Sequence, residues 1–366
     1  MITCQKCRAL LEPGTRECPY CHSDQRHHAA PSESQDAEKT TRFGLWILGL
    51  IVGIYFLMVA VDPARDDPGT KPFEPSNTAL DMFGAADPFL VDECGQTWRL
   101  LASLFLHVDL LHLAFNAIAL FLLIPIAAGA FGIHRTVCLY FFSGLCGAVL
   151  SNVARDGGVG ASGALCGLIG ASAVFGKRRG GAMGDALMRR MIGWAVFIGI
   201  YGVFLADRID NMGHLGGFLG GAALGYFASG ARARGGRADR AWMFVARATV
   251  VGAIVVAAVF WVPFVLRISE RREMQLYRSQ AERTLRAVAE TLHTGNVENL
   301  PETLPDGPRG TDEVRDAIQE ALNLARAKDR AAGEALAHAS DALEAWSTSL
   351  ACTHCMVPST GFDAHK

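Results

Sequence analysis

Three short stretches of the sequence carry side chains that could perform acyl chemistry. Ser162 lies in a Gly-Ala-Ser-Gly sequence, His214 follows Gly213, and His112 lies four positions before Asn116. A serine hydroxyl becomes a nucleophile when an adjacent imidazole takes its proton, and the imidazole can later pass that proton to a leaving amine. Side chains four positions apart lie on one face of a helix. His112 and Asn116 could therefore both donate hydrogen bonds to a developing oxyanion.

Each stretch also has a structural explanation. A serine in an apolar helix commonly bonds the carbonyl four residues earlier, and polar side chains can hold neighbouring membrane helices together. The serine stretch differs from the nucleophile elbow of the α/β-hydrolases, because Ala164 replaces a required glycine and no strand precedes it. Ser162 is nevertheless expected at a helix N-terminus. Free N–H groups and the helix dipole favour an oxyanion there, and Gly163 is a further donor.

Small residues recur at four-residue steps beside Ser162 and beside His214. They are Gly163, Gly167 and Ala171 in the first segment, and Gly213, Gly217 and Gly221, with Gly216 and Gly220, in the second. This spacing lets two helix backbones approach closely, so we expect the segments to pack face to face and to bring the hydroxyl within reach of the imidazole. Asp207 and Asp210 precede His214 in a loop, and a buried carboxylate would be costly at this depth. A Ser–His dyad without a buried acid is therefore expected.

The elements that must position these residues are predicted to be membrane spans. Seven windows contain no Asp, Glu, Lys or Arg: 43–61, 110–134, 136–154, 157–176, 191–206, 211–231 and 248–266. A spanning helix needs about 20 mainly apolar residues. The short fifth window reaches this length if Met188 is included and Arg189 and Arg190 snorkel. We predict an all-α, polytopic membrane helical bundle with seven spans; a large soluble protein with buried core helices is the alternative.

Composition agrees with this division of the chain. Of the 366 residues, 51% are hydrophobic and 19% are charged, against roughly 25% charged in an average soluble domain. The apolar content of the middle region excludes disorder there. The formal net charge of −2 gives no electrostatic reason to expect a nucleic-acid partner.

The charges of the loops predict the orientation in the membrane. The 177–190 and 232–247 loops are rich in Lys and Arg, whereas the 62–109 loop is acidic. Because basic loops stay on the cytoplasmic side, we expect a cytoplasmic N-terminus and an external C-terminus in a cell membrane, which we interpret as a bacterial inner membrane. The first apolar run follows 42 polar residues, so no cleavable signal peptide is visible and the first span is expected to be an uncleaved anchor.

The N-terminal segment, residues 1–24, carries two Cys-x-x-Cys pairs. Its cysteines are Cys4, Cys7, Cys18 and Cys21. Two such turns can complete a tetrahedral Zn²⁺ site, and disulfides would not persist on the reducing cytoplasmic side. We predict a zinc ribbon with a structural or adhesive role and no catalytic one; a redox-active or unliganded tail is the alternative. Residues 25–42 are predicted to be a flexible linker.

The C-terminal region, residues 267–366, is predicted to be a helical tail domain that binds partners or substrates. Helical periodicity covers residues 270–292 and 312–349, and a proline-rich loop separates these segments. On an oxidising outer face, Cys352 and Cys355 are predicted to form a strained disulfide, with a metal-binding pair as the alternative.

Taken together, these motifs resemble the rhomboid intramembrane serine proteases. The matching features are His-x-x-x-Asn, Gly-x-Ser-Gly and Gly-His with a glycine face, in this order, and Trp98-Arg99 upstream of His107. The resemblance covers about residues 43–230 and implies six core spans around a water-accessible cavity, with residues 231–266 as a basic loop and an additional seventh span. It also implies hydrolysis of peptide bonds in or near transmembrane helices of membrane-protein substrates, within the lipid bilayer and without a catalytic cofactor.

The resemblance also assigns roles to individual residues. It implies that Ser162 and His214 are catalytic and that His112, Asn116 and Gly163 stabilise the oxyanion. The residues with structural roles near the site would be Gly160, Gly213, Gly217, His107, Trp98 and Arg99.

Two positions depart from the family pattern. Ala128 stands where a glutamate that anchors the outer loop is common, and Cys166 stands where an aromatic residue supports the histidine ring. A rhomboid-like pseudoprotease, which would bind membrane helices without cutting them, is one alternative, and the retention of both Ser162 and His214 argues against it. A transporter or channel is another. It would need ionisable residues deep in several spans, whereas the polar groups here cluster at the outer ends of three.

Overall fold

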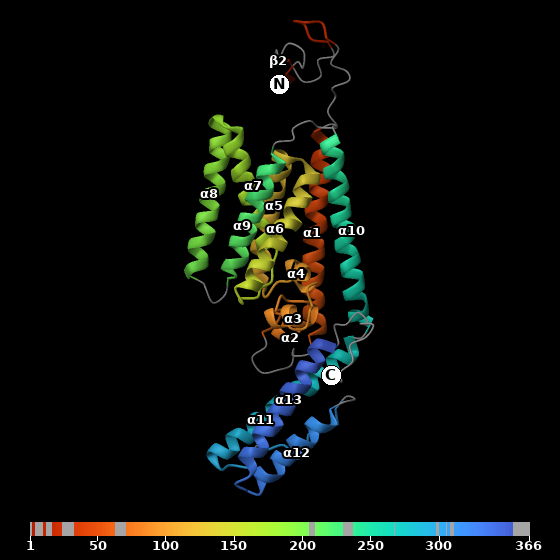
Figure 1. The fold of residues 1–366 in the computed structure, drawn as a ribbon, viewed down its shortest axis with the longest axis vertical. Helices are drawn as coiled ribbons and strands as arrows, with labels where there is room; N and C mark the ends of the chain where they lie inside the picture. The colour runs from red at the N-terminus through yellow and green to blue at the C-terminus, as the bar shows by residue number, and fades with distance from the viewer. Residues whose placement is uncertain are drawn as a thin grey trace.

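The computed structural model describes residues 2–3, 10–11, 17–23, 33–62, 71–204, 209–229, 237–266, 268–297, 300–304, 306–307 and 311–353. Apart from one pair of two-residue strands, its elements are helical, which confirms the all-α class. The long helices run side by side in one bundle (Figure 1). They are α1 (Glu33–Val61), α5 (Leu110–Phe131), α6 (Ile133–Val153), α7 (Ser162–Arg179), α8 (Gly181–Phe204), α9 (Asn211–Ala228) and α10 (Arg237–Leu266).

Among the described residues, five helices are long and apolar enough to cross a membrane, and the chain is accordingly a multi-pass membrane protein. They are Glu38–Val61, Leu110–Phe131, Ile133–Val153, Gly181–Phe204 and Ala238–Val259. The other two predicted spans correspond to α7 and α9, which have 18 residues each. These two are less apolar, because α7 ends in three basic residues and α9 is rich in glycine.

The ends of several helices differ from the predicted boundaries. α1 begins at Glu33, inside the predicted linker 25–42, and an ion pair of 2.7 Å between Arg42 and Glu38 supports this polar part of the helix. α8 and α10 also begin before the charge-free windows that they contain. Charged residues continue these helices beyond their apolar parts, which a count of uncharged residues cannot detect.

Glycines bring α9 into backbone contact with α7 and α6 at the centre of the bundle. A Cβ atom on Gly217 would overlap the Gly163 carbonyl, and one on Gly221 would overlap Gly167. On the adjacent helix α6, a Cβ atom on Gly147 would lie 2.6 Å from the carbonyl oxygen of Gly213. Only hydrogen fits at these positions, so α7 and α9 pack face to face as their glycine spacing predicts.

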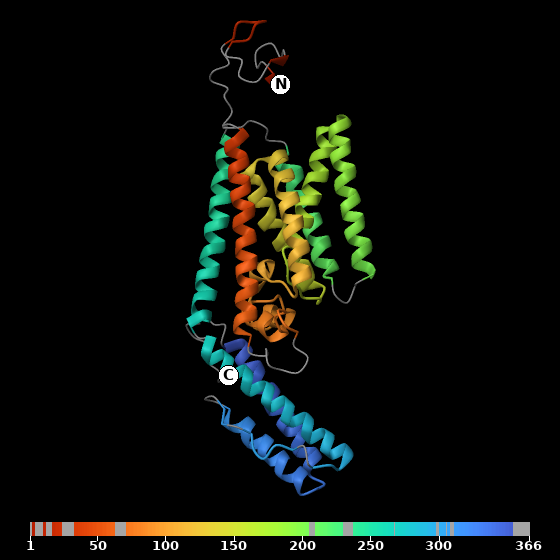
Figure 2. The ribbon, with the colours of Figure 1, turned by 180° about the vertical axis from the view of Figure 1, so that it is seen from behind.

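Short helices close one end of the bundle, between α1 and α5 (Figure 2). They are α2 (Asn77–Phe83), α3 (Pro88–Asp92), α4 (Arg99–Ala102) and the 3₁₀ helix η2 (Ser103–Phe105). Arg99 is buried and donates to the carbonyl oxygens of Asp81 and Ala85 at 2.8 and 3.1 Å. A Cβ atom on Gly84, whose φ is +104°, would lie 2.5 Å from the Trp98 ring. Trp98 and Arg99 thus hold this outer loop together.

The two ends of the chain lie at opposite ends of the bundle (Figure 1). At the N-terminus, β1 (Ile2–Thr3) pairs antiparallel with β2 (Leu10–Leu11). At the other end, α11 (Ile268–Thr294), α12 (Asp312–Arg326) and α13 (Ala332–Thr353) share a separate apolar core. The predicted helical segment 312–349 is therefore two helices, interrupted where Lys328 adopts a φ of 55°.

Substitution of Gly221 should reveal the contribution of the close approach of α7 and α9. Gly221→Ala places a methyl group against the Gly167 backbone, so we expect a loss of roughly 1–3 kcal/mol of stability, as for other overpacked cores. Thermal unfolding of the detergent-purified protein measures this loss. The matched control is Gly193→Ala on α8, where a Cβ atom would meet nothing within 4 Å. Equal melting temperatures for the two variants would contradict the packing described above.

Candidate active site

The hydroxyl of Ser162 and the imidazole of His214 are in hydrogen-bonding contact. Ser162 is the first residue of α7, His214 lies in the first turn of α9, and the Ser162 Oγ to His214 Nε2 distance is 2.8 Å. Both residues are half-buried. If Nδ1 carries the proton of the neutral imidazole, Nε2 can accept the proton of the serine hydroxyl. The geometry is that of a nucleophile next to its base.

Asp210 positions His214 but is not a third member of this pair. Its carboxylate accepts a hydrogen bond from the Gly213 backbone N–H at 2.6 Å and so caps α9, while the His214 N–H donates to the Asp210 carbonyl oxygen at 3.1 Å. Burial raises the pKa of Asp210, and the bond from Gly213 opposes this effect. His214 Nδ1 is buried and has no hydrogen-bond partner among the described residues. Asp207 lies outside them.

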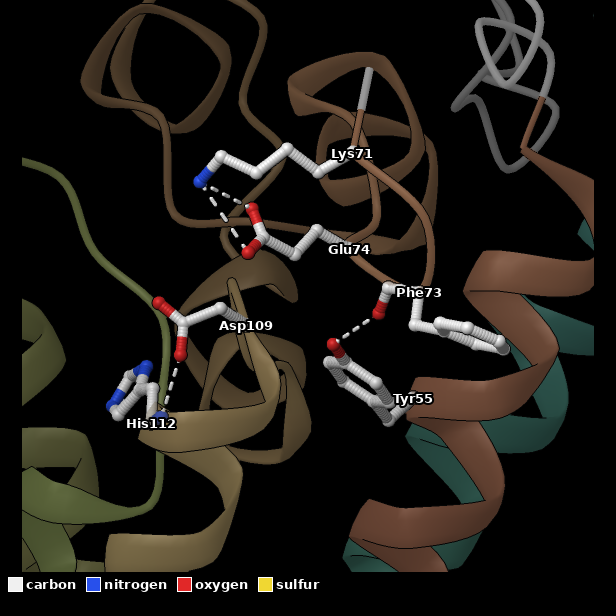
Figure 3. Close-up of polar contacts among 6 residues, drawn as sticks. All are labelled: Tyr55, Lys71, Phe73, Glu74, Asp109 and His112. Carbon is white, nitrogen blue, oxygen red and sulfur yellow. Dashed lines mark hydrogen bonds and ion pairs between the residues drawn. The ribbon is translucent and has the colours of Figure 1, made fainter.

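His112 lies against the backbone that leads into Ser162. A Cβ atom on Gly160, whose φ is +129°, would lie 2.9 Å from His112 Nε2 and 3.6 Å from Ser162 Oγ. This glycine therefore lets the His112 ring and the serine hydroxyl share one small space. Asp109 caps α5 by accepting the His112 backbone N–H at 2.6 Å (Figure 3), which fixes the start of the helix that carries the ring.

Asn116 lies one turn further along α5 and is buried. Its amide nitrogen donates to the His112 carbonyl oxygen at 2.9 Å, and its Oδ1 atom has no partner among the described residues. The amide must therefore give up a bond within its own helix before it can donate to an oxyanion. The backbone N–H groups of Ser162 and Gly163 lie in the first turn of α7, so they do not have to give up a bond within their own helix before they donate to an oxyanion.

The His107 ring packs against the His112 ring. It is fully buried, and the two ring centroids are 5.0 Å apart. Burial, together with the nearby His112, lowers the pKa of His107 to about 3. His107 is thus a neutral packing residue at neutral pH, in keeping with the structural role that the resemblance implies.

A small cavity lies next to Ser162. Its volume is about 20 Å³, which is room for roughly one water molecule. The polar groups that line it belong to Ser103, Ser151, Ser162 and Asp210. A water held here would lie beside the nucleophile inside the bundle.

Hydrogen bonds and an ion pair connect the outer loop to residues 152–158, which precede Ser162. The sequence motifs do not reveal these contacts. Ala86 and Gly158 form an isolated antiparallel bridge, with N–H to O distances of 3.1 and 3.3 Å. Asp92, at the end of α3, accepts from Asn152 Nδ2 at 2.9 Å and pairs with Arg155 at 3.2 Å. These residues are far apart in the sequence and belong to no motif, so only the glycines at 157 and 158 hint at a turn.

The two departures from the family pattern occupy buried positions. Cys166 lies one turn along α7 from Ser162 and is 6% exposed. The Ala128 carbonyl oxygen accepts the Gly132 N–H at 2.8 Å and so ends α5. Because Ala128 has no polar side chain, the bonds of Arg99, Asp92 and the Ala86–Gly158 bridge hold the outer loop without a contribution from this position.

The cysteines predicted to bind zinc are only partly described. Cys4 and Cys7 lie outside the described residues. Cys18 is fully buried, and its backbone forms a turn in which the His22 N–H donates to the Cys18 carbonyl oxygen at 2.8 Å and the Cys18 N–H donates to the Ser23 carbonyl oxygen at 3.0 Å. Within the described part of the chain, no group of three or more His, Cys, Asp and Glu side chains could hold a metal ion.

Comparisons with known proteins cover the region that contains this site. The Rhomboid domain family matches residues 94–231. RHOMBOID-like protein 5 of Arabidopsis thaliana is 32% identical over 215 residues, which are 50% of this chain and 67% of the relative. Rhomboid protease GluP of Bacillus subtilis is 35% identical over 163 residues, which are 42% of this chain and 31% of the relative. RHOMBOID-like protein 1 of Arabidopsis thaliana is 29% identical over 183 residues, 46% of this chain and 43% of the relative. The chain thus spans less than half of two of these relatives.

The depressed pKa of His107 predicts a loss of stability in acid. Between the ordinary pKa of 6.5 and about 3, the unfolded chain binds a proton at this residue and the folded chain does not. The free energy of unfolding therefore includes the full contribution of neutral His107 above pH 6.5. It decreases as the pH falls toward 3. Between pH 8 and pH 5, the free energy of unfolding should fall by roughly 2 kcal/mol less in His107→Phe than in the parent protein.

Denaturant unfolding of both proteins at the two pH values measures this difference. His112 and His214 are present in both proteins, so the comparison isolates residue 107. An identical pH dependence in the variant and the parent would show that His107 is not held neutral by the fold.

Proposed function

Since the chain belongs to the rhomboid family of membrane proteins, we propose that it is an intramembrane serine endopeptidase in which Ser162 is the nucleophile and His214 its base. The observation that carries this proposal is the 2.8 Å contact between Ser162 Oγ and His214 Nε2. The matched family region, residues 94–231, contains both residues. The 35% identity to Rhomboid protease GluP, which is named as a protease, further supports it.

The reaction begins with transfer of the serine proton to His214 Nε2 as Ser162 Oγ attacks the scissile carbonyl. The tetrahedral intermediate collapses when His214 returns the proton to the leaving amine, which leaves an acyl group on Ser162. A water molecule then attacks the acyl carbon while His214 takes its proton, and His214 passes that proton to Ser162 Oγ as the bond between the acyl carbon and this oxygen breaks. The small cavity next to Ser162 is large enough to hold such a water.

The oxyanion of the intermediate needs donors that are fixed before the reaction. The Ser162 and Gly163 N–H groups lie at the positive end of the α7 dipole. His112 Nε2, held beside Gly160, is a side-chain donor from the other side of the same space. Asn116 joins them once its amide leaves the His112 carbonyl oxygen.

The substrates are proposed to be membrane proteins that carry a transmembrane helix. Their scissile carbonyl must leave its helical hydrogen bond before it can be attacked, so residues that weaken the helix near the cut and a small side chain at the cut favour cleavage. The bilayer supplies the surroundings of both partners, and irregular backbone at this depth is tolerated only where it lines a cavity.

We also propose that the N-terminus is cytoplasmic, in a bacterial inner membrane, and that the active site opens on the outer side. The basic residues that end α7 and those that begin α10 lie at the end of the bundle that is nearest the N-terminal strands (Figure 1). The start of α7, which carries Ser162, lies at the other end, as do the outer loop and the tail helices (Figure 1). Basic segments remain on the cytoplasmic side.

A fluorophosphonate probe tests the catalytic assignment, because it labels only an activated serine. In detergent-purified protein, Ser162→Ala and His214→Ala should abolish labelling and lower cleavage of single-span membrane substrates by at least about 10³-fold. The matched control is Ser172→Ala, a buried serine on the same helix, which should label like the parent.

The alternative, a pseudoprotease that binds membrane helices without cleavage, predicts a different result. Its parent protein would not be labelled, or would be labelled equally in Ser162→Ala, while still capturing membrane helices. One observation favours this alternative. The buried Cys166 stands where an aromatic residue would support His214.

We propose zinc binding by the N-terminal segment as a separate, structural property. The buried Cys18 and the backbone turn through Cys21 suit one half of a Cys₄ site, and the spacing of Cys4 and Cys7 predicts the other half. The segment is then a compact unit for contact with protein partners.

Metal analysis of the full-length protein tests this site. We expect about one zinc per chain in the parent, and loss of that zinc in Cys18→Ser and Cys21→Ser. Cys146→Ser, which removes a free thiol inside the bundle, is the control. Less than half a zinc per chain in the parent would count against the site.

A further inference from the structure

Five exposed cations lie around the turn between α7 and α8, and the proposed reaction uses none of them. They belong to residues 176–190, which we call the basic hairpin and in which Asp185 is the one acidic residue. The cations are Lys177, Arg178, Arg179, Arg189 and Arg190. None of the five forms an ion pair with another residue that the structure describes. Their charges are therefore available to an anion from outside the chain.

The two helices of the basic hairpin approach each other at backbone distance. A Cβ atom on Gly176 would lie 2.7 Å from the Gly184 carbonyl oxygen and 2.8 Å from the Met188 backbone nitrogen. Two glycines with positive φ, at 180–181, make the turn between the helices. The basic last turn of α7 therefore lies beside the part of α8 that leads to its two arginines. Charges of one sign at such close quarters attract a counter-ion.

The apolar parts of three neighbouring helices end where the basic hairpin lies. The apolar part of α7 stops before Lys177, the charge-free window within α8 starts at Met191, and α9 ends at Ala228. These helix ends lie at one end of the bundle in both views (Figures 1 and 2). In a membrane protein, the level at which apolar helices give way to Lys and Arg is that of the lipid headgroups. The unpaired cations thus face lipid phosphates.

Two arginines of the basic hairpin stack on aromatic rings that suit this depth. Arg178 Cζ lies 4.3 Å from the centroid of the Tyr226 ring on α9, and Arg190 Cζ lies 5.4 Å from that of Trp194, one turn along α8. Tyr and Trp favour the membrane interface. A ring against the face of a guanidinium leaves the N–H groups at its edge free, and that edge binds phosphate through two parallel hydrogen bonds.

The usual reasons for basic residues at a helix end explain only part of this cluster. Residues 177–179 complement the dipole at the end of α7. Arg189 and Arg190 lie in the third turn of α8, away from either helix end. The general excess of Lys and Arg in cytoplasmic loops concerns the number of charges. It does not explain why two guanidinium groups are stacked on rings at the headgroup level.

We propose that the basic hairpin binds an anionic phospholipid, whose phosphate accepts hydrogen bonds from the guanidinium edges of Arg178 and Arg190. The three other cations add electrostatic attraction to the negative headgroup. Phosphatidylglycerol fits this site, because its headgroup carries a net negative charge. Phosphatidylcholine fits it poorly, because its choline group brings a positive charge to the cluster. The proposal does not depend on the proposed protease function.

Native mass spectrometry of the detergent-purified full chain tests the site. In titrations with lipids of identical acyl chains, the parent should bind phosphatidylglycerol at least about tenfold more tightly than phosphatidylcholine. The double variant Arg178→Gln with Arg190→Gln should lose most of this preference. Equal binding of the two lipids by the parent, or an unchanged preference in the double variant, would overturn the proposal.

Two further double variants separate a site from diffuse attraction. Arg178→Lys with Arg190→Lys keeps both charges but removes the planar edge, so it should bind phosphatidylglycerol more weakly than the parent. The matched control is Arg240→Gln with Arg247→Gln, which removes two exposed arginines from α10 and should bind like the parent. A control that loses as much affinity as Arg178→Gln with Arg190→Gln would show attraction without a site.

Thermal unfolding identifies the source of the phosphate. Phosphatidylglycerol should raise the melting temperature of the parent and of the α10 control by more than that of Arg178→Gln with Arg190→Gln. Millimolar inorganic phosphate should neither raise the melting temperature of the parent nor displace the lipid. If free phosphate stabilises the parent as well as the lipid does, the lipid assignment is wrong. If the Gln variant melts lower than the parent without lipid, the same comparison is made with the Lys variant.

Discussion

The close approach of α7 and α9 is the constraint on which the site depends. A hydroxyl and an imidazole on separate helices can share a proton only if the two backbones lie nearer than ordinary side chains allow. Glycines at 163, 167, 217 and 221 meet this condition, because a Cβ atom on the last two would overlap the opposite backbone. The 2.8 Å contact between Ser162 and His214 follows from this packing. Side chains alone could not produce it.

Much of the bundle could be predicted because its signals are local. Charge-free windows mark apolar helices regardless of what they contact, and four-residue glycine steps mark a face that must meet another backbone. The order of the site residues along separate helices could also be predicted, because each lies near the start of its own charge-free window. These residues are His112, Asn116, Ser162 and His214. The starts of α1 and α8 could not be predicted in this way, because α1 begins with polar and charged residues and α8 begins with glycines, and both resemble loops in composition.

The outer loop shows what such signals leave out. Arg99 satisfies two loop carbonyl oxygens, and Asp92 binds a side chain on α6 and another beyond it. These partners are brought together by the fold and not by their spacing, so no pattern in one sequence marks them.

The Nδ1 atom of His214, which has no hydrogen-bond partner among the described residues, limits the rate of the proposed reaction. In serine proteases with three-residue sites, a carboxylate on that nitrogen steadies the positively charged ring, and its loss slows turnover by about 10⁴-fold. Here the described part of the chain offers no such anion, and Asp210 is committed to the end of α9. The proposed protease would therefore be intrinsically slow. A slow reaction would suit the proposed membrane-protein substrates, because proteins that diffuse in the same bilayer meet repeatedly and do not need to be cut at the first encounter.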